Sequence, residues 1–304
     1  MFNLLNRTVL HTFGAVVEPY YWQPAQTSPD QELGHDFLEG GSLRETRWLH
    51  QRIDVDYNGW WMDLIPVSVI KQIGLALPLF IKWDDSEYGL RAKAAGYPTV
   101  SLPGAAVWHV SWIDKDDLVG WQAYFHDRNR YITALLHSRF AFGGDIVRNS
   151  QVQDLKHLAS MQYYTVAGRL RAQRDLLAGP DHLHMLESSA LPEIRAMASQ
   201  YSDAVLHKEY EEYPPVHEPK PHRPRKRRKF NRPELILEGM KAVARQFMPM
   251  RAGATENPQT AIAFKDNKWW NIAQWDSALV TNAEGTGIAW YLRKPDLMRR
   301  MMAE

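Results

Sequence analysis

The chain has 304 residues, which is enough to bury a large core and to form two domains. The absence of cysteine excludes structural disulfides and thiolate metal sites, and the 36 basic and 35 acidic residues favour no particular partner. No apolar run approaches the roughly 18 residues of a membrane span, and no charged start followed by an apolar core is visible. We therefore expect no secretory signal and a soluble or peripheral protein.

Residues 1–50 begin directly on an apolar-rich run, without a polar lead-in. Residues 11–17 are typical of a strand and a turn, and residues 23–45 are rich in Gly, Pro, Ser and acids, which indicates a surface loop. Such a start is unusual, because a domain seldom starts inside its own core.

The next region places two carboxylates at a predicted junction. Residues 77–81 are large and apolar, as in a buried strand, and residues 86–95 have a helical pattern that stops at Gly96. Asp84 and Asp85 would then lie between strand and helix, where the helix N-terminus favours negative charge and where α/β sheets bind ligands. A purely structural role as a helix cap remains open for the pair.

Two further predicted strands, over residues 99–102 and 105–108, bring His109 to the end of a neighbouring element. Two acids and one histidine could supply a general base and a metal ligand. A hydrogen-bonded structural histidine is the alternative. Glu87 and Arg91 are four residues apart and should pair on an exposed helix face.

Tryptophans are concentrated around these acids. Aromatic faces beside carboxylates are a frequent way to hold sugar rings, although tryptophans also fill cores. The residues concerned are Trp60, Trp61, Trp83, Trp108 and Trp112.

Beyond His109 the pattern becomes helical. We predict helices over residues 116–136, over 146–177 without interruption, and over 182–201 with Pro192 as a kink or break. Residues 126–130, His-Asp-Arg-Asn-Arg, are either a solvated helix face or a phosphate or sugar contact. Both interpretations stay open.

Residues 213–233 form a predicted linker with many prolines and the basic run 223–229. The linker is either a spacer or a contact to anionic lipid. In a lipid contact each basic residue near the charged surface would contribute roughly 1 kcal/mol of binding free energy. We expect no nucleic-acid partner, because no aromatic residues are interleaved. After the linker we predict a helix over 233–247, a small β unit over 261–292 and the start of a helix at 298–302.

Four runs carry a resemblance to a known family: residues 52–61, 77–92 with its Trp-Asp-Asp core, 102–109 and 121–126. Together they resemble the polymerising galactofuranosyltransferases that build the galactan of actinobacterial cell walls. The similarity extends from the first residues to near the end and is weakest in the basic linker. It implies an inverting, metal-dependent glycosyltransferase with UDP-galactofuranose as donor and a polyprenyl-linked galactan as acceptor.

The resemblance implies an α/β fold in four parts. Residues 1–115 would be the second half of a GT-A type, Rossmann-like nucleotide-sugar domain, and 116–212 a helical domain. Residues 213–233 would be the linker and 234–304 a small C-terminal α+β segment. The family's Asp-rich metal motif lies upstream of these positions and has no equivalent here. Asp54 and Asp56 have a spacing suited to a cation and diphosphate, but they correspond to the approach to Trp60.

The resemblance also assigns roles. Asp85 would be the catalytic base and Asp84 its orienting neighbour, while His109 would complete a Mn²⁺ or Mg²⁺ site begun by upstream aspartates. Ala15 stands where the family has a glutamate, so one cleft carboxylate is lost. The residues expected to line the sugar-binding cleft are Trp60, Trp61, His11, Trp22, Trp112 and His126.

Three functions follow as alternatives. The first is galactofuranosyl transfer in cell-wall arabinogalactan synthesis, by a homotetramer that is cytoplasmic and peripheral on the inner face of the plasma membrane. The second is a catalytically incompetent acceptor-binding or oligomerisation module. The third is transfer from another nucleotide sugar.

Overall fold

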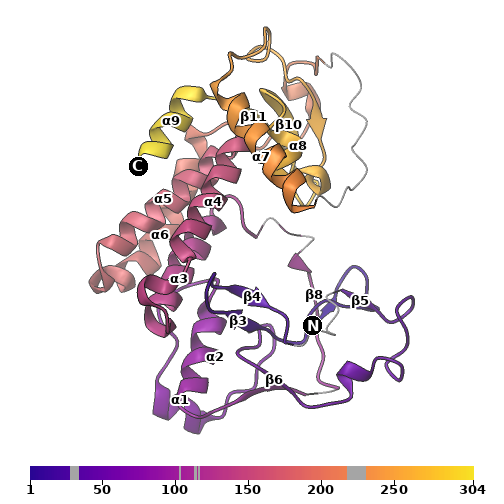
Figure 1. Cartoon of the computed structure of the whole chain (residues 1–304), viewed down its shortest axis with the longest axis vertical. Coiled ribbons are helices and arrows are strands. Elements are labelled where there is room, and N and C mark those ends of the chain that lie inside the picture. Colours follow the sequence, from indigo (N-terminus) through magenta and orange to yellow (C-terminus); the bar gives the residue numbers. More distant parts are fainter. Residues whose placement is uncertain (28–33, 103, 113–114, 116, 218–230) are drawn as a thin grey trace. The chain divides into compact units, whose positions relative to one another are not determined.

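The computed structural model describes residues 1–27, 34–102, 104–112, 115, 117–217 and 231–304. The chain divides into two compact units, coloured mainly indigo to magenta and magenta to yellow in Figure 1. Unit 1 comprises Met1–Lys115, Phe125–Asn149 and Ala178–Glu187, and unit 2 comprises Asp116–Tyr124, Ser150–Leu177 and Ser188–Glu304. In the described part of the chain no helix combines the length and apolar character of a membrane span.

The strands of unit 1 are short and form small sheets. A four-stranded sheet has the order β5 (His35–Asp36), β2 (Val9–Leu10), β1 (Phe2–Asn3) and β8 (Trp108–His109). Strands β3 (Val16–Glu18) and β4 (Gln23–Ala25) pair with each other, as do β6 (Ile53–Val55) and β7 (Thr99–Ser101). Strands β4 and β5 lie within the stretch that was expected to be a loop. The parallel pairing of β1 with β8 sets His109 opposite Asn3.

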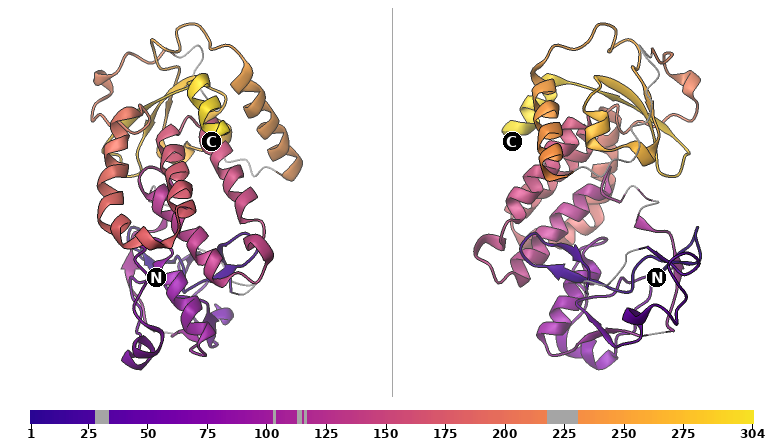
Figure 2. Two further views of the ribbon diagram at one scale, coloured as in Figure 1. Left: turned by 90° about the vertical axis from the view of Figure 1, so that its left-hand side faces the viewer. Right: turned by 45° about the vertical axis from the view of Figure 1, so that its right-hand side comes forward.

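Helix α2 (Asp84–Ala94) is the central helix of unit 1, with α1 (Val67–Ile73) beside it in both sets of views (Figures 1 and 2). The helix predicted over residues 86–95 is confirmed, and Gly96 follows it at φ +90°. Gly89 lets the backbone after β6 approach closely, because a Cβ there would lie 2.4 Å from the Asp56 carbonyl oxygen.

The segment before α2 is not the strand predicted over residues 77–81. Phe80, Lys82 and Trp83 have φ values of 70°, 68° and 65°, which are left-handed and incompatible with a strand. Within this irregular segment Leu79 is fully buried whereas Phe80 is 46% exposed, so only part of the apolar run packs into the core.

The expected pair of Glu87 and Arg91 forms, although not on an exposed helix face, and the side chains of Asp54 and Asp56 make separate contacts. Glu87 does pair with Arg91 at 2.8 Å, but its side chain is only 2% exposed and also contacts His137. Asp54 and Asp56 do not act together, because exposed Asp54 pairs with Arg52 whereas buried Asp56 accepts from the Val17 amide.

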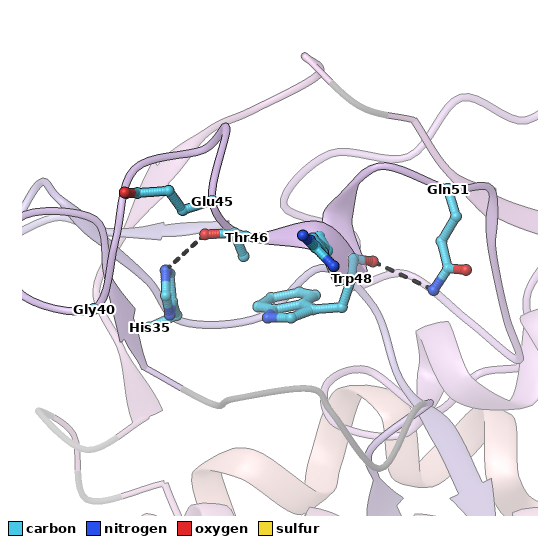
Figure 3. A pocket seen from close by; sticks show the side chains of 7 residues that line it. His35, Gly40, Glu45, Thr46, Trp48 and Gln51 are labelled. Carbon is cyan, nitrogen blue, oxygen red and sulfur yellow. Dashed lines mark hydrogen bonds between the residues drawn. The ribbon is translucent and has the colours of Figure 1, made fainter.

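A polar pocket of about 490 Å³ opens between β5 and the 3-10 helix at Arg47–Leu49 (Figure 3). On its wall Thr46 Oγ1 lies 3.1 Å from His35 Nε2, and Gln51 donates to the Trp48 carbonyl. None of the nine candidate site residues lies among the residues that line it. The lining residues are His35, Gly40, Glu45, Thr46, Arg47, Trp48 and Gln51.

The helical region contains α3 (Gln122–His137), α4 (Ile146–Ala159), α5 (Tyr163–Leu177) and α6 (Leu183–Met197), which holds Pro192 in its interior. The uninterrupted helix predicted over 146–177 is wrong, because the chain turns at Met161, whose φ is 59°. His157 Nδ1 lies 2.6 Å from Gln162 Oε1 across this break. Short 3-10 turns lie at Ala141–Gly143, Pro180–His182, Ala198–Gln200, Tyr210–Glu212 and Phe264–Asp266.

The rest of unit 2 is the predicted small α+β arrangement. Helix α7 (Arg232–Phe247) precedes a three-stranded sheet of order β11 (Ile288–Leu292), β10 (Ser277–Thr281) and β9 (Ala261–Ile262). Helices α8 (Trp269–Ile272) and α9 (Pro295–Ala303) complete the unit. Helix α7 confirms the helix predicted over 233–247, and α9 confirms the one predicted at 298–302. The basic run 223–229 lies outside the described residues.

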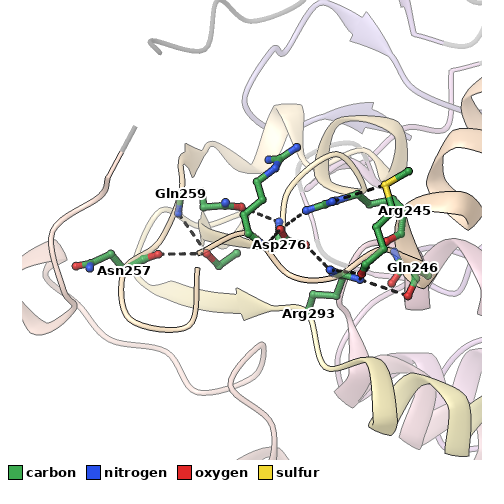
Figure 4. A network of polar contacts seen from close by, with 9 residues as sticks. Arg245, Gln246, Asn257, Gln259, Asp276 and Arg293 are labelled. Carbon is green, nitrogen blue, oxygen red and sulfur yellow. Dashed lines mark hydrogen bonds and ion pairs between the residues drawn. The ribbon is translucent and has the colours of Figure 1, made fainter. Parts of the chain in front are cut away.

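A buried ion network joins α7 to this sheet (Figure 4). Asp276 is fully buried and accepts from Arg293 Nε at 2.6 Å, from the Arg245 guanidinium and from the Arg251 amide. Arg293 in turn donates to the Arg245 and Met248 carbonyls at 3.0 Å. A cation at these carbonyls stabilises the C-terminus of α7.

We predict that Asp276→Asn lowers the free energy of unfolding of unit 2 by about 3–5 kcal/mol, because two guanidinium groups lose their buried counter-charge. Asp296→Asn is the matched control, since the Asp296 to Arg299 pair is exposed and should contribute less than about 1 kcal/mol. Urea unfolding followed by circular dichroism measures both. Equal losses for the two variants would contradict the role of the network.

Candidate functional site

The acid pair opens helix α2 from a left-handed residue. Trp83 is the N-cap at φ 65°, and Asp84 and Asp85 are the first two helical residues. Asp85 Oδ1 accepts from the Ser86 amide at 2.7 Å and from Ser86 Oγ at 3.2 Å. The carboxylates therefore satisfy N–H groups of the first helical turn, as a cap would.

Both carboxyl groups of the pair also have raised pKa values, which a capping role does not explain. Burial raises the pKa of Asp85 to about 6, the Asp84 carboxylate adds to the rise, and hydrogen bonds from Ser86 oppose it. Burial also raises the pKa of Asp84. A carboxylate with a pKa near neutrality is suited to accept a proton.

Tyr57 packs against the pair from the segment after β6. Its side chain is 6% exposed, and the Asp85 carboxylate adds to the burial that raises the pKa of the Tyr57 hydroxyl. Gly89 permits this packing, since a Cβ at that position would meet Tyr57 Cβ at 2.6 Å. Sequence reasoning missed Tyr57.

Four predicted site residues form one continuous set of rings. Trp112 lies between His11, at 5.1 Å, and Trp61, at 5.9 Å, and Trp61 also contacts His109 at 5.8 Å between ring centroids. The Trp61 ring lies directly over Gly59, where a Cβ would come within 2.3 Å of it. The glycine therefore determines where this indole can lie.

Two more predicted residues lie against α2 and its cap. Trp60 contacts Tyr88 of α2 at 5.7 Å, and His126 of α3 contacts Trp83 at 6.0 Å. Trp60 is 40% exposed and Trp112 is 39% exposed, so both present indole surface to solvent. Exposed aromatic surface beside a carboxylate can stack on a sugar ring.

Unlike Trp60 and Trp112, Trp22 is only 2% exposed and belongs to the core of unit 1. Its position leaves no open indole face for stacking. Ala15, the position at which the resemblance implies a missing carboxylate, lies in the same core. The buried members of this cluster are Ala15, Val17, Trp22, Tyr57, Trp83, Ala134 and Ile146.

A backbone contact of His109 determines its tautomer. Its Nδ1 lies 2.9 Å from the Val110 carbonyl oxygen, which assigns the proton to Nδ1 and leaves the Nε2 lone pair for a cation. Among the described residues, however, no group of three or more His, Cys, Asp or Glu side chains could hold a metal ion. These residues alone do not make the cation site that the resemblance implies.

The polar run at residues 126–130 is not a solvated helix face. Asp127, Arg128, Asn129 and Arg130 are at most 4% exposed. Arg130 donates to the carbonyls of Tyr21 and Trp22. One sequence signal could have shown this: four consecutive polar residues cover a whole helical turn, so some of them had to face inward.

A carboxylate with a raised pKa at the start of a helix, together with an exposed indole packed on the same helix, is compatible with a carbohydrate-binding protein. The comparisons agree with this class. Residues 146–304 match the family described as Galactofuranosyltransferase-2, domain 3. The chain therefore belongs to the galactofuranosyltransferase-2 family.

Two curated relatives extend the similarity over the site residues. Galactofuranosyltransferase GlfT2 of Mycolicibacterium smegmatis is 40% identical over 303 residues, which is 96% of this chain and 45% of that protein. Galactofuranosyltransferase GlfT2 of Mycobacterium tuberculosis is 40% identical over 306 residues, covering 96% of this chain and 46% of that protein. The chain thus spans about half the length of these relatives.

The raised pKa of Asp85 gives a pH-dependent prediction. Because the folded pKa of about 6 exceeds the ordinary value of 3.8, the folded state loses stability relative to the unfolded state as pH rises between these values. Asp85→Asn removes that loss. We expect the variant to gain about 1–3 kcal/mol relative to the parent between pH 4 and pH 7.

Urea unfolding at several pH values measures this difference. Asp54→Asn is the control, because Asp54 is exposed and pairs with Arg52 on the surface. A difference between parent and Asp85→Asn that stays constant with pH would contradict the raised pKa.

Proposed function

We propose that the chain carries the acceptor-activating part of a galactofuranosyltransferase. The reaction moves galactofuranose from UDP-galactofuranose to a lipid-linked galactan during arabinogalactan synthesis. The observation that supports it most is Asp85, a carboxylate with a pKa near 6 at the start of α2, with the exposed Trp60 indole in contact with Tyr88 of that helix. The family match gives the sugar.

In this mechanism Asp85 accepts the proton of the attacking acceptor hydroxyl. The hydroxyl oxygen bonds to the anomeric carbon as the bond from that carbon to UDP breaks, so a single displacement inverts the configuration. Asp84 orients the acceptor or the base, and its negative charge helps keep the Asp85 pKa high. Trp60, Trp61 and Trp112 hold sugar rings of the acceptor.

The wider assignments are proposals of the same kind. Unit 1 contains part of a GT-A type nucleotide-sugar domain, and His109 supplies one ligand to a Mn²⁺ or Mg²⁺ ion whose other ligands are not in the described residues. Residues 223–229 bind an anionic membrane surface, which suits a polyprenyl-anchored acceptor. The full protein is a homo-oligomer on the inner face of the plasma membrane.

Acceptor binding without transfer is the second candidate. It is favoured by the side chains that unit 1 brings together, because the rings of His11, Trp112, Trp61 and His109 are in contact whereas a set of three cation ligands is not found among the described residues. A module of this kind would bind galactan and form no product. The two candidates therefore differ in turnover and not in acceptor binding.

The first prediction for this function concerns transfer. With UDP-galactofuranose, Mn²⁺ and a synthetic digalactofuranose acceptor, we expect product, and we expect Asp85→Asn to lower the rate about 10²- to 10⁴-fold because an amide cannot take the proton. Asp54→Asn should keep the parent rate. Product counted by mass spectrometry measures all three.

Two outcomes would change the assignment. An unchanged rate in Asp85→Asn would remove Asp85 as the base. No product from the parent chain, together with measurable acceptor binding, would establish the second candidate. Competition with other nucleotide sugars tests whether the donor is UDP-galactofuranose.

The second prediction concerns acceptor binding. Trp61→Ala should weaken binding of a galactofuranose oligosaccharide about tenfold, because a stacking face is lost. Gly59→Ala should weaken it similarly, since the new Cβ displaces the Trp61 ring without removing it. Trp270→Ala in unit 2 is the control, and isothermal calorimetry is the measurement; equal affinity in all variants would contradict the cleft.

A further inference from the structure

The segment that leads into the acid pair has an unfavourable backbone. Phe80, Lys82 and Trp83 are non-glycine residues with φ between 65° and 70°. Such residues enter the left-handed region at a steric cost and stay there only when surrounding contacts hold them. The groups that hold this segment therefore determine where Asp84 and Asp85 lie.

One buried amide contacts three carbonyls of this segment. Asn129 of α3 is fully buried, and its Nδ2 lies 2.9, 2.8 and 2.9 Å from the carbonyl oxygens of Leu79, Ile81 and Lys82, so its two hydrogens are shared among three acceptors. The third of these carbonyls belongs to the residue directly before Trp83. The contacts thus extend to within two residues of Asp84.

Arg128 fixes the orientation of this amide. Its Nε donates to Asn129 Oδ1 at 2.9 Å, so the Nδ2 end of the amide must face the segment. A second Arg128 nitrogen donates to the Leu79 carbonyl at 3.0 Å. Arg128 is 1% exposed and lies over the Phe125 ring, which also contacts Phe80 at 5.1 Å.

We infer that Asn129, oriented by Arg128, is a positioning residue that holds residues 79–82 in the conformation that sets Asp84 and Asp85 in place. The carbonyls of Ile81 and Lys82 belong to neither a helix nor a strand, so a side-chain donor has to satisfy them, while the Leu79 carbonyl also accepts from the Ile81 amide. Asn129 touches no reacting atom. Its relevance to catalysis rests on the proposed function, whereas its effect on the segment does not.

Amide hydrogen exchange of the 304-residue chain tests the effect on the segment. In Asn129→Ala, peptides covering residues 79–86 should exchange about tenfold faster or more, because the contacts that hold them are lost. Peptides from α1 and from unit 2 should exchange at the parent rate. Exchange of 79–86 within twofold of the parent would overturn the inference.

Thr133→Val is the matched control. Thr133 lies one turn later in α3, is also fully buried, and donates from Oγ1 to the Asn129 carbonyl at 2.8 Å. This variant loses a buried hydrogen bond of α3 without removing the Asn129 side chain. Equal acceleration of residues 79–86 in Thr133→Val would mean that general loosening of α3, and not the Asn129 amide, explains the effect.

Arg128→Lys serves if Asn129→Ala does not fold. It keeps the positive charge but removes the bond that orients the amide, so residues 79–86 should exchange faster than in the parent. Unchanged exchange in this variant would overturn the inference as well.

A carboxyl titration by NMR separates positioning from simple stabilisation. Loosening the segment should lower the midpoint of Asp85 by about one pH unit, towards the ordinary value for Asp, with Asp85→Asn used for assignment. Thr133→Val should leave the midpoint unchanged. An Asn129→Ala midpoint equal to that of the parent would contradict the inference.

Steady-state kinetics test the effect of Asn129 on catalysis. If the parent transfers sugar, Asn129→Ala should lower kcat with little change in the KM for UDP-galactofuranose. If the parent shows neither transfer nor acceptor binding, the proposed function fails, and the exchange and titration results still decide the role of Asn129.

Discussion

Polar contacts at the carbonyl groups of Leu79, Ile81 and Lys82 constrain the start of helix α2, where the acid pair lies. These carbonyls belong to neither a helix nor a strand, and all three lie within hydrogen-bonding distance of one amide nitrogen of α3. A buried carbonyl without a donor costs free energy comparable to a lost hydrogen bond. The direction in which α2 begins is therefore determined by polar side chains of another helix and not by the local sequence.

Hydrogen bonds and ion pairs with α1 and α3 hold the middle of α2 in place. Arg91 donates to the Ile73 carbonyl at the end of α1, and Tyr88 donates to that of Gly74. Glu87 lies between Arg91 and His137 of α3. The helix is thus held on both sides, so that the acid pair projects from a rigid element, as a functional site requires.

The sequence predicts best those features whose cause is local. The end of α2 before Gly96 and the helices near the C-terminus are predicted by the spacing of apolar residues and by residues that start or stop helices. The break at Met161 carries neither Gly nor Pro, and it depends on a contact between His157 and Gln162 that no pattern shows. The left-handed residues before α2 depend likewise on α3, more than forty positions later in the sequence.

The sequence pattern alone indicates Asp84, Asp85 and His109 as candidates, whereas their roles come from the family resemblance. The structure adds the ring contacts among His11, Trp112, Trp61 and His109. Placing Asp85 over an apolar cluster that contains Tyr57 and Trp83 raises its pKa but makes its ionised form less stable. Hydrogen bonds from Ser86 and the charge of Lys82 offset part of that effect. A glutamate in place of Ala15 would bring a further negative charge into this core and would require a partner of its own. With alanine there, the elevated pKa of Asp85 depends on burial and on the Asp84 carboxylate.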